Sequence, residues 1–234
     1  MVVFINALKD FFEDSKKKAF DNKENNREVY IFNKEEKLFE KKLAKDIKVG
    51  DIIKVFNEEF LPVDLILVSS QSSQEEDLTK IIEDELGVCY YESKNLDGET
   101  NLKFKQANKE IAKKYRKDED LVNLKGLITC SPPSEYINEF GGRYFENTED
   151  NENYIPLDKQ CLLLRGCKLK QIFCITGIAV YVGHDTKILK NYPSHKYKVA
   201  STQSKLNIHV LILLLLDIII CILTAILHIV SPNV

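Results

Sequence analysis

The sequence predicts a mainly β domain, a distorted jelly roll or β-sandwich, with one helix before it and one membrane-spanning helix after it. Short β-branched and aromatic runs recur from Arg27 to about Val182, which is typical of strands. The stretch before them is amphipathic, and the stretch after them is apolar on every side. With 234 residues, 44% hydrophobic and 29% charged, the chain can form one globular core with an appendage. Four segments are expected: a helical lead-in (1–26), the β domain (27–190), a basic juxtamembrane linker (191–207) and the membrane helix (208–230).

The lead-in is expected to be an amphipathic helix that ends near Asn25 and Asn26. Its apolar residues recur at helical spacing among many charges, at Phe4, Ile5, Leu8, Phe11, Phe12 and Phe20.

Six runs are predicted as strands of the β domain: Val29–Phe32, Ile52–Phe56, Leu65–Val68, Val88–Tyr91, Leu127–Cys130 and Ile172–Tyr181. Four of the nine glycines, Gly50, Gly98, Gly166 and Gly183, fall where strands must turn. Residues 71–85 and 147–153 are polar and acidic, and we expect both to be surface loops rather than calcium sites.

The predicted membrane helix holds 17 Ile, Leu or Val residues among its 23. Asp217 in its middle opposes insertion by roughly 2.5–3.5 kcal/mol, and the apolar residues, at about −0.3 to −0.6 kcal/mol each, outweigh it. Lysines precede the helix within a short distance (187, 190, 196, 198 and 205) and none follows it. The positive-inside rule therefore predicts an integral membrane protein whose globular domain is cytosolic.

Composition excludes several classes of function. A formal net charge of −3 gives no reason to expect nucleic-acid binding. The six cysteines form no Cys-x-x-Cys pair and are interpreted as reduced thiols. The four histidines are scattered, so no metal site is expected.

The run Asp97-Gly98-Glu99-Thr100 is the most informative motif. Gly98 permits backbone angles that other residues resist, so the corner can present Glu99 as a proton acceptor that positions water. Asp-Gly is also a common hairpin signal, and a plain turn is the alternative reading.

Four blocks of the chain, in order, resemble the actuator domain of P-type ATPases of the phospholipid-flippase class. They are residues 49–55 with 61–67, residues 94–103, residues 162–169 and residues 180–188. Cation pumps of the same superfamily typically carry Thr-Gly-Glu at the corner, so the resemblance points to lipid transport. The chain departs from the family in having no tryptophan and in having Val63 where an alanine is usual.

The resemblance implies that Glu99 aligns a water molecule against an aspartyl phosphate formed from ATP. Asp97, Gly98, Thr100 and Asn101 would shape that corner, although Thr100 and Asn101 equally suit a role in satisfying the turn backbone. The block from His184 to Lys187 is expected to be structural, closing the domain.

The sequence contains no Asp-Lys-Thr-Gly-Thr phosphorylation motif and no nucleotide-binding motif. The chain alone is therefore not expected to hydrolyse ATP or to bind a cofactor; ATP and Mg²⁺ are implied for a full-length pump. The expected partners are the phosphorylation domain and remaining membrane helices of that pump, its phospholipid, and an accessory subunit whose presence the sequence leaves open. Two alternatives stand beside an incomplete flippase product: a non-enzymatic, membrane-anchored actuator-like binding or regulatory module, and a degenerate remnant.

Overall fold

The computed structural model describes residues 2–72, 86–147, 153–191 and 201–230. It divides into two compact units, residues 18–193 and residues 1–17 with 194–234. The segments 71–85 and 147–153, expected to be surface loops, lie outside the described residues except at their margins.

Helix α1 (Val2–Asn25) occupies the predicted lead-in. Its last turn is closed by hydrogen bonds from the Asn26 N–H to the Asn22 carbonyl (3.1 Å) and from the Arg27 N–H to the Glu24 carbonyl (3.3 Å). Strand β1 (Glu28–Asn33) begins immediately afterwards.

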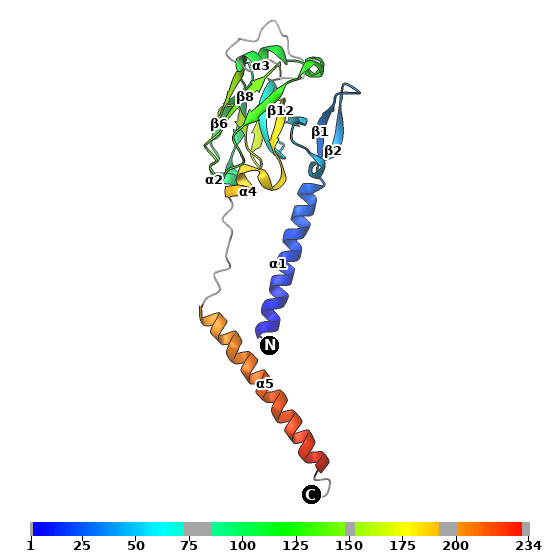
Figure 1. The fold of residues 1–234 in the computed structure, drawn as a ribbon, viewed down its shortest axis with the longest axis vertical. Helices are drawn as coiled ribbons and strands as arrows, with labels where there is room; N and C mark the ends of the chain where they lie inside the picture. The colour runs from blue at the N-terminus through cyan, green and yellow to red at the C-terminus, as the bar shows by residue number, and fades with distance from the viewer. Residues whose placement is uncertain (1, 73–85, 148–152, 192–200, 231–234) are drawn as a thin grey trace. The chain divides into compact units, whose positions relative to one another are not determined.

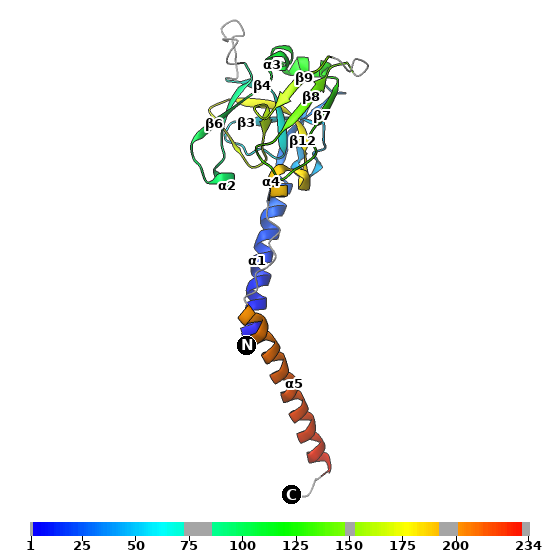
Figure 2. The same cartoon turned by 60° about the vertical axis from the view of Figure 1, so that its left-hand side comes forward.

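Twelve strands in the described residues form three antiparallel sheets (Figure 1). The six-stranded sheet has the order β10-β4-β12-β3-β1-β2. Its other strands are β2 (Leu38–Leu43), β3 (Ile52–Phe56), β4 (Asp64–Gln71), β10 (Leu162–Leu163) and β12 (Cys174–Tyr181). The second sheet is β11 (Lys168–Lys170), β5 (Val88–Glu92) and β6 (Leu102–Gln106). The third is β7 (Leu127–Cys130), β8 (Gly141–Phe145) and β9 (Ile155–Asp158), which lie side by side in Figure 2.

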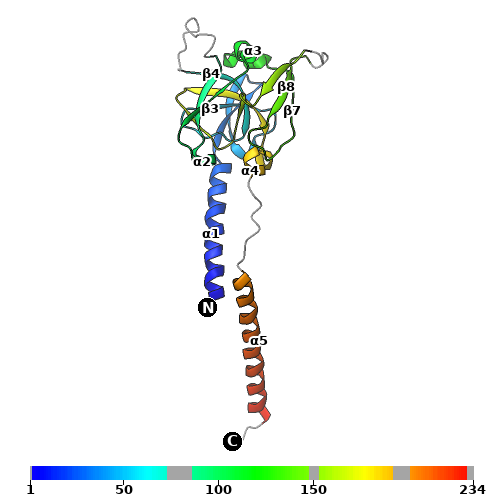
Figure 3. The ribbon, with the colours of Figure 1, turned by 90° about the vertical axis from the view of Figure 1, so that its left-hand side faces the viewer.

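Short helices complete the β domain: α2 (Lys94–Asp97), α3 (Lys109–Lys114), α4 (Lys187–Asn191), and 3₁₀ turns at Ala44–Asp46, Asp118–Asn123 and Gly183–Asp185. Within this domain α2 and α4 lie at one end and α3 at the opposite end (Figure 3).

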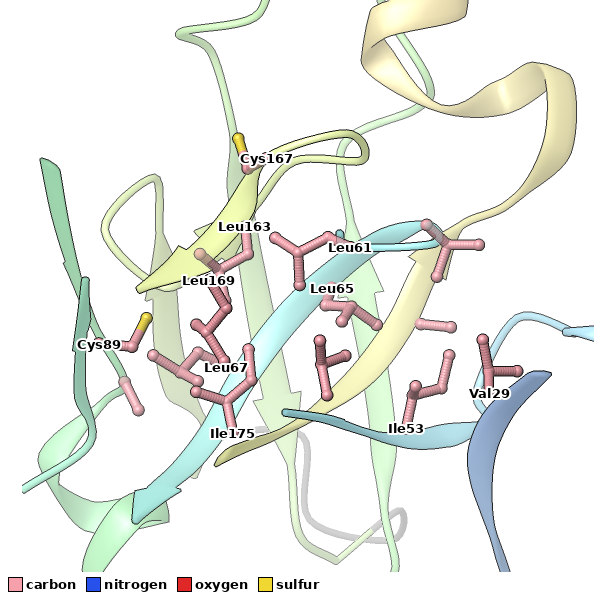
Figure 4. Packing of buried hydrophobic residues seen from close by; sticks show 14 of the residues in the cluster. Val29, Ile53, Leu61, Leu65, Leu67, Cys89, Leu163, Cys167, Leu169 and Ile175 are labelled. Carbon is pink, nitrogen blue, oxygen red and sulfur yellow. The ribbon is translucent and has the colours of Figure 1, made fainter. Parts of the chain in front are cut away.

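The six-stranded sheet is covered on both faces, which strand β4 shows directly. Side chains alternate across a strand, and Leu65 and Leu67 of β4 enter one core cluster while Ile66 and Val68 enter another; each is at most 1% exposed. The first cluster extends to β5 and β11, and the second extends to α3, β8 and β9. Figure 4 shows Leu65 and Leu67 among the packed side chains of the first cluster. The fold is thus a sandwich whose central strands are apolar on both faces.

A buried ionic group fastens the end of the domain that carries α4. The Asp64 carboxylate, at the start of β4, accepts hydrogen bonds from the main-chain N–H groups of Arg165 (2.8 Å) and Lys187 (2.7 Å). The Lys187 ammonium donates to the Tyr136 carbonyl (2.9 Å) and the Ser134 hydroxyl (3.2 Å). Both Asp64 and Lys187 are fully buried. Burial raises the pKa of Asp64, against the two N–H donors and the Lys187 charge, which lower it.

The block from His184 to Lys187 therefore packs as part of this closing turn. Asp185 pairs with Lys190 at 3.0 Å, and the Thr186 hydroxyl donates to the Gly183 carbonyl at 3.0 Å.

Helix α5 (Ser201–Val230) contains the predicted membrane segment. It begins seven residues before the predicted start at residue 208, so residues 201–207 of the predicted linker are helical; residues 192–200 are not described. Ile208–Leu227, 20 residues, is the one helix of the described chain that is long and apolar enough to cross a membrane. At 1.5 Å per residue it extends about 30 Å, the thickness of a hydrocarbon core. Its polar His209 and Thr224 bond to the helix's own carbonyls, at Lys205 (2.7 Å) and Cys221 (2.9 Å).

These observations confirm the predicted fold class: mainly β, with an N-terminal helix and an apolar C-terminal helix. All six predicted runs contain strands, although the last strand begins at Cys174 rather than Ile172. The six cysteines are free thiols, and burial raises the pKa of Cys89 to about 12, so this side chain packs as a neutral group.

Candidate functional site: an acidic corner between two strands

The Asp97-Gly98-Glu99 corner connects β5 to β6 through the single helical turn α2. The turn is anchored from within, because Ser93 is buried and the half-buried Leu96 packs against the first core cluster. It ends at Gly98, which has φ 76° and ψ −1° and donates its N–H to the Lys94 carbonyl at 3.0 Å. This left-handed conformation is one that glycine adopts without strain, and it is the turn that the sequence predicted.

Asp97 is the hub of the corner. Its carboxylate accepts hydrogen bonds from the Ser93 hydroxyl (2.8 and 3.0 Å to the two oxygens) and from the Glu99 main-chain N–H (2.9 Å). Asp97 thus ties the backbone that follows the glycine to the side chain of Ser93, which precedes the turn.

Lys103, at the second position of β6, joins the two acids. Its ammonium lies 2.5 Å from Asp97 Oδ2 and 2.9 Å from Glu99 Oε2. The Glu99 side chain is 57% exposed, so its carboxylate is both oriented by Lys103 and accessible to an incoming group.

Two members of this network, Ser93 and Lys103, were not among the residues expected to act at the site. Thr100, by contrast, was expected at the corner, but it is exposed, and in the described part of the chain its hydroxyl makes no hydrogen bond to either acid. Asn101 is likewise exposed.

The Lys103 ammonium, followed by the Glu99 N–H, lowers the pKa of Asp97 to about 2. The Asp97 carboxylate, followed by that of Glu99, raises the pKa of Lys103. A depressed carboxyl pKa stabilises the corner above the ordinary value near 3.8, and this stabilisation is lost as the pH falls through about 2. We expect the corner to stay ordered from neutral pH to about 3, and to loosen below that. Carboxyl chemical shifts of Asp97, followed by NMR against pH, test this. A midpoint near 4 would contradict the network.

Two cavities border the corner. The smaller, about 340 Å³, is lined by Asp97 and Lys103 together with Ser93, Lys105 and Asn138 among others. The larger, about 630 Å³, includes Asn95 and is otherwise lined by the end of α1 and by the segments around Arg27, Ala44, Leu61 and Arg165. Glu99 lines neither cavity and projects from the surface instead.

The residues of the corner do not form a cation site. Across the described ranges, no group of three or more His, Cys, Asp or Glu side chains is placed to hold a metal ion. The two acids of the corner already share the Lys103 ammonium. Their arrangement suits a carboxylate that accepts a proton or orders a water molecule.

Over most of its length the chain is similar to known phospholipid-transporting ATPases. It is 36% identical over 215 residues to the phospholipid-transporting ATPase tat-1 of Caenorhabditis elegans, covering 91% of this chain and 17% of that protein. It is 33% identical over 207 residues to the phospholipid-transporting ATPase DRS2 of Saccharomyces cerevisiae, covering 88% of this chain and 14% of that protein. The human phospholipid-transporting ATPase VD is 32% identical to it over 228 residues, covering 97% of this chain and 15% of that protein. No family model matches the chain.

Among solved structures, the match to a zinc-transporting PIB-type ATPase in its E2.Pi state covers 70% of this chain and 15% of that one, with 10% identity and a TM-score of 0.36. Each of these relatives matches nearly the whole chain, and the chain spans about one sixth of their length. It therefore belongs to the family of phospholipid-transporting P-type ATPases, of which it corresponds to one segment.

Proposed function

We propose that this chain is the actuator segment of a phospholipid-transporting P-type ATPase, and that Glu99 positions the water that hydrolyses the pump's aspartyl phosphate. The observation that carries the proposal is the corner itself: an exposed carboxylate on a glycine turn that is held from both sides by Asp97 and Lys103. The proposal is further supported by relatives named as phospholipid transporters over about nine-tenths of the chain.

In the proposed step, a water oxygen attacks the phosphorus of the acyl phosphate and the bond from phosphorus to the aspartate oxygen breaks. Glu99 accepts a proton from the water, inorganic phosphate leaves, and the aspartate carboxylate is restored. Such a base must reach within about 3 Å of the water that it activates. A residue at the tip of a rigid corner can be delivered to that position as a unit, because the corner does not need to reorder.

The remaining chemistry is assigned to other parts of a full-length pump. ATP and Mg²⁺ would be bound there, because the acids of the corner are occupied by Lys103 and are not arranged as a metal site. The phosphorylation domain, the other membrane helices and the phospholipid are the proposed partners.

A chain replacement tests the proposal. The counterpart segment of the yeast ATPase DRS2, which aligns over 207 residues, would be replaced by this whole chain. We expect the chimera to form a phosphoenzyme from ATP and to break it down, and expect the same chimera with Glu99→Gln to form it without breaking it down. A phosphoenzyme equally short-lived in both would overturn the assignment of Glu99. The anchored binding module would then be the better reading.

The membrane arrangement gives a separate prediction. We propose that Ile208–Leu227 crosses the membrane with residues 18–193 on the cytosolic side, given the lysines that precede it. When the chain is made in the presence of microsomes, it should resist alkaline extraction, and external protease should digest the β domain while sparing the apolar helix. As a control, Leu214→Lys with Ile218→Lys should abolish the alkali resistance, because each lysine at a helix centre opposes insertion by roughly 3 kcal/mol. Protection of the β domain would contradict the orientation.

A further inference from the structure

Lys103 makes a contact at the corner that the water-positioning mechanism does not require. Its ammonium lies within 2.9 Å of one oxygen from each acid, Asp97 and Glu99. The two carboxylates are only two residues apart in a tight turn, so without a cation they would repel each other. One ammonium between them holds both in place.

The position of Lys103 is set by the β hairpin rather than by the corner. In the register of β5 with β6, Lys103 lies opposite Tyr91, and Lys105 lies opposite Cys89. Both lysines are on the same face of β6, but Lys105 donates to the Lys159 carbonyl at 2.6 Å and makes no ion pair with the corner in the described residues. The register of the sheet thus places the Lys103 ammonium beside the two acids.

We propose that Lys103 is a positioning residue for Glu99: it holds the Glu99 carboxylate in one orientation and offsets the negative charge that the corner carries toward a phosphoryl group. This inference rests on the proposed function of the chain.

The charge matters because of what the corner would approach. With Asp97 and Glu99 ionised, the corner carries two negative charges, and Lys103 reduces the sum to one. A phosphoryl group is itself anionic, and like charges a few ångströms apart repel most strongly where water is excluded. Loss of Lys103 would leave a base that is both less ordered and more strongly repelled.

The test uses the chimera that carries the whole chain, with three variants. Lys103→Met removes the charge and keeps the length of the side chain, and Lys103→Arg keeps the charge. Lys170→Met is the matched control: Lys170 is on β11 of the same three-stranded sheet and pairs with Glu58, which retains Lys168 as a partner. The rate of phosphoenzyme breakdown is measured from pH 5 to pH 8.

We expect Lys103→Met to slow breakdown about tenfold, as a modest misplacement of a catalytic group does. Lys103→Arg should recover most of the rate, and Lys170→Met should match the unmodified chimera. Methionine already keeps the length of the side chain, so recovery by arginine identifies the charge as the property that was lost.

Two different outcomes of this experiment distinguish failure of the proposed function from failure of the role of Lys103. If Glu99→Gln leaves breakdown fast, the proposed function fails. If Glu99→Gln slows it while Lys103→Met leaves it unchanged across the pH range, the role of Lys103 is overturned.

If the chimera with Lys103→Met does not assemble, a second measurement tests the role of Lys103. In the isolated whole chain, NMR titration of the Asp97 carboxyl should show a midpoint that moves from about 2 toward the ordinary value when Lys103 is replaced by methionine. An unchanged midpoint would show that Lys103 does not hold the acids, and the inference would fall.

Discussion

Replacing Glu99 with glutamine in the pump that carries this chain is expected to slow breakdown of the phosphoenzyme by about 10²- to 10⁴-fold, the usual contribution of a positioned general base. Glutamine has nearly the same shape but cannot accept a proton from water at neutral pH, and it cannot form the ion pair with Lys103. Formation of the phosphoenzyme should continue, because the proposed function assigns the phosphorylated aspartate and the ATP site to other parts of the pump. Chasing radiolabelled phosphoenzyme with unlabelled ATP, and stopping samples with acid, measures the breakdown rate directly.

The control for this prediction is Glu58→Gln. Glu58 is also an exposed acid that pairs with lysines, Lys168 and Lys170, and neither pair includes a residue of the corner. Its replacement should leave breakdown within about twofold of the unmodified rate, since exposed ion pairs contribute little. Equal slowing by both substitutions would point to a general disturbance of the domain and would remove the special role of Glu99.

The second large effect is expected at Asp64. Replacing it with alanine leaves the main-chain N–H groups of Arg165 and Lys187 without their acceptor and removes a carboxylate whose charge favours the buried Lys187 ammonium. A hydrogen bond to a charged group contributes about 1.5–3 kcal/mol, so losing both should lower the free energy of unfolding by about 3–5 kcal/mol. Domains have roughly 5–15 kcal/mol in total, so the variant should be close to unfolding at body temperature.

Asp64→Asn separates the loss of the carboxylate charge from the loss of the hydrogen-bond acceptors. Asparagine keeps the shape and one acceptor oxygen, so it can satisfy one of the two N–H groups, and a smaller loss of about 1–3 kcal/mol is expected. Urea unfolding of the whole chain in detergent, followed by the fluorescence of its ten tyrosines, measures both variants, because the chain has no tryptophan. Glu58→Ala serves as the surface control and should not shift the midpoint. An unfolding midpoint for Asp64→Ala equal to that of the unmodified chain would refute the role of the buried group.

The strands that the sequence predicted and those that it did not differ in their place in the sheets. Five of the six unpredicted strands, β2, β6, β9, β10 and β11, lie at sheet edges. An edge strand is paired on one side only, so it can carry charges or a proline and still form through its neighbour. β2 reads Leu-Phe-Glu-Lys-Lys-Leu and β9 contains Pro156, and neither has the apolar signal of β4. The sixth, β8, begins with two glycines, which local propensity counts against a strand.

The sequence could predict those parts of the candidate site that depend on residues adjacent in the chain. Asp97, Gly98 and Glu99 adjoin in sequence, and the left-handed glycine and the hydrogen bond from the Glu99 N–H to Asp97 follow from local turn chemistry. The role of Lys103 was not predictable, because it depends on the hairpin register that returns β6 alongside β5. The Asp64–Lys187 contact joins residues 123 positions apart, and only the three-dimensional structure brings them together.

That last contact also determines how a mechanical load would enter the β domain. Tension applied to the chain beyond Asn191 reaches the domain through α4, whose first residue is tied by its main chain to the start of β4. Strand β4 is an inner strand, bonded to β10 on one side and to β12 on the other. A pull therefore reaches an inner strand that is bonded on both sides, and two ladders oppose its removal instead of the single ladder that holds an edge strand.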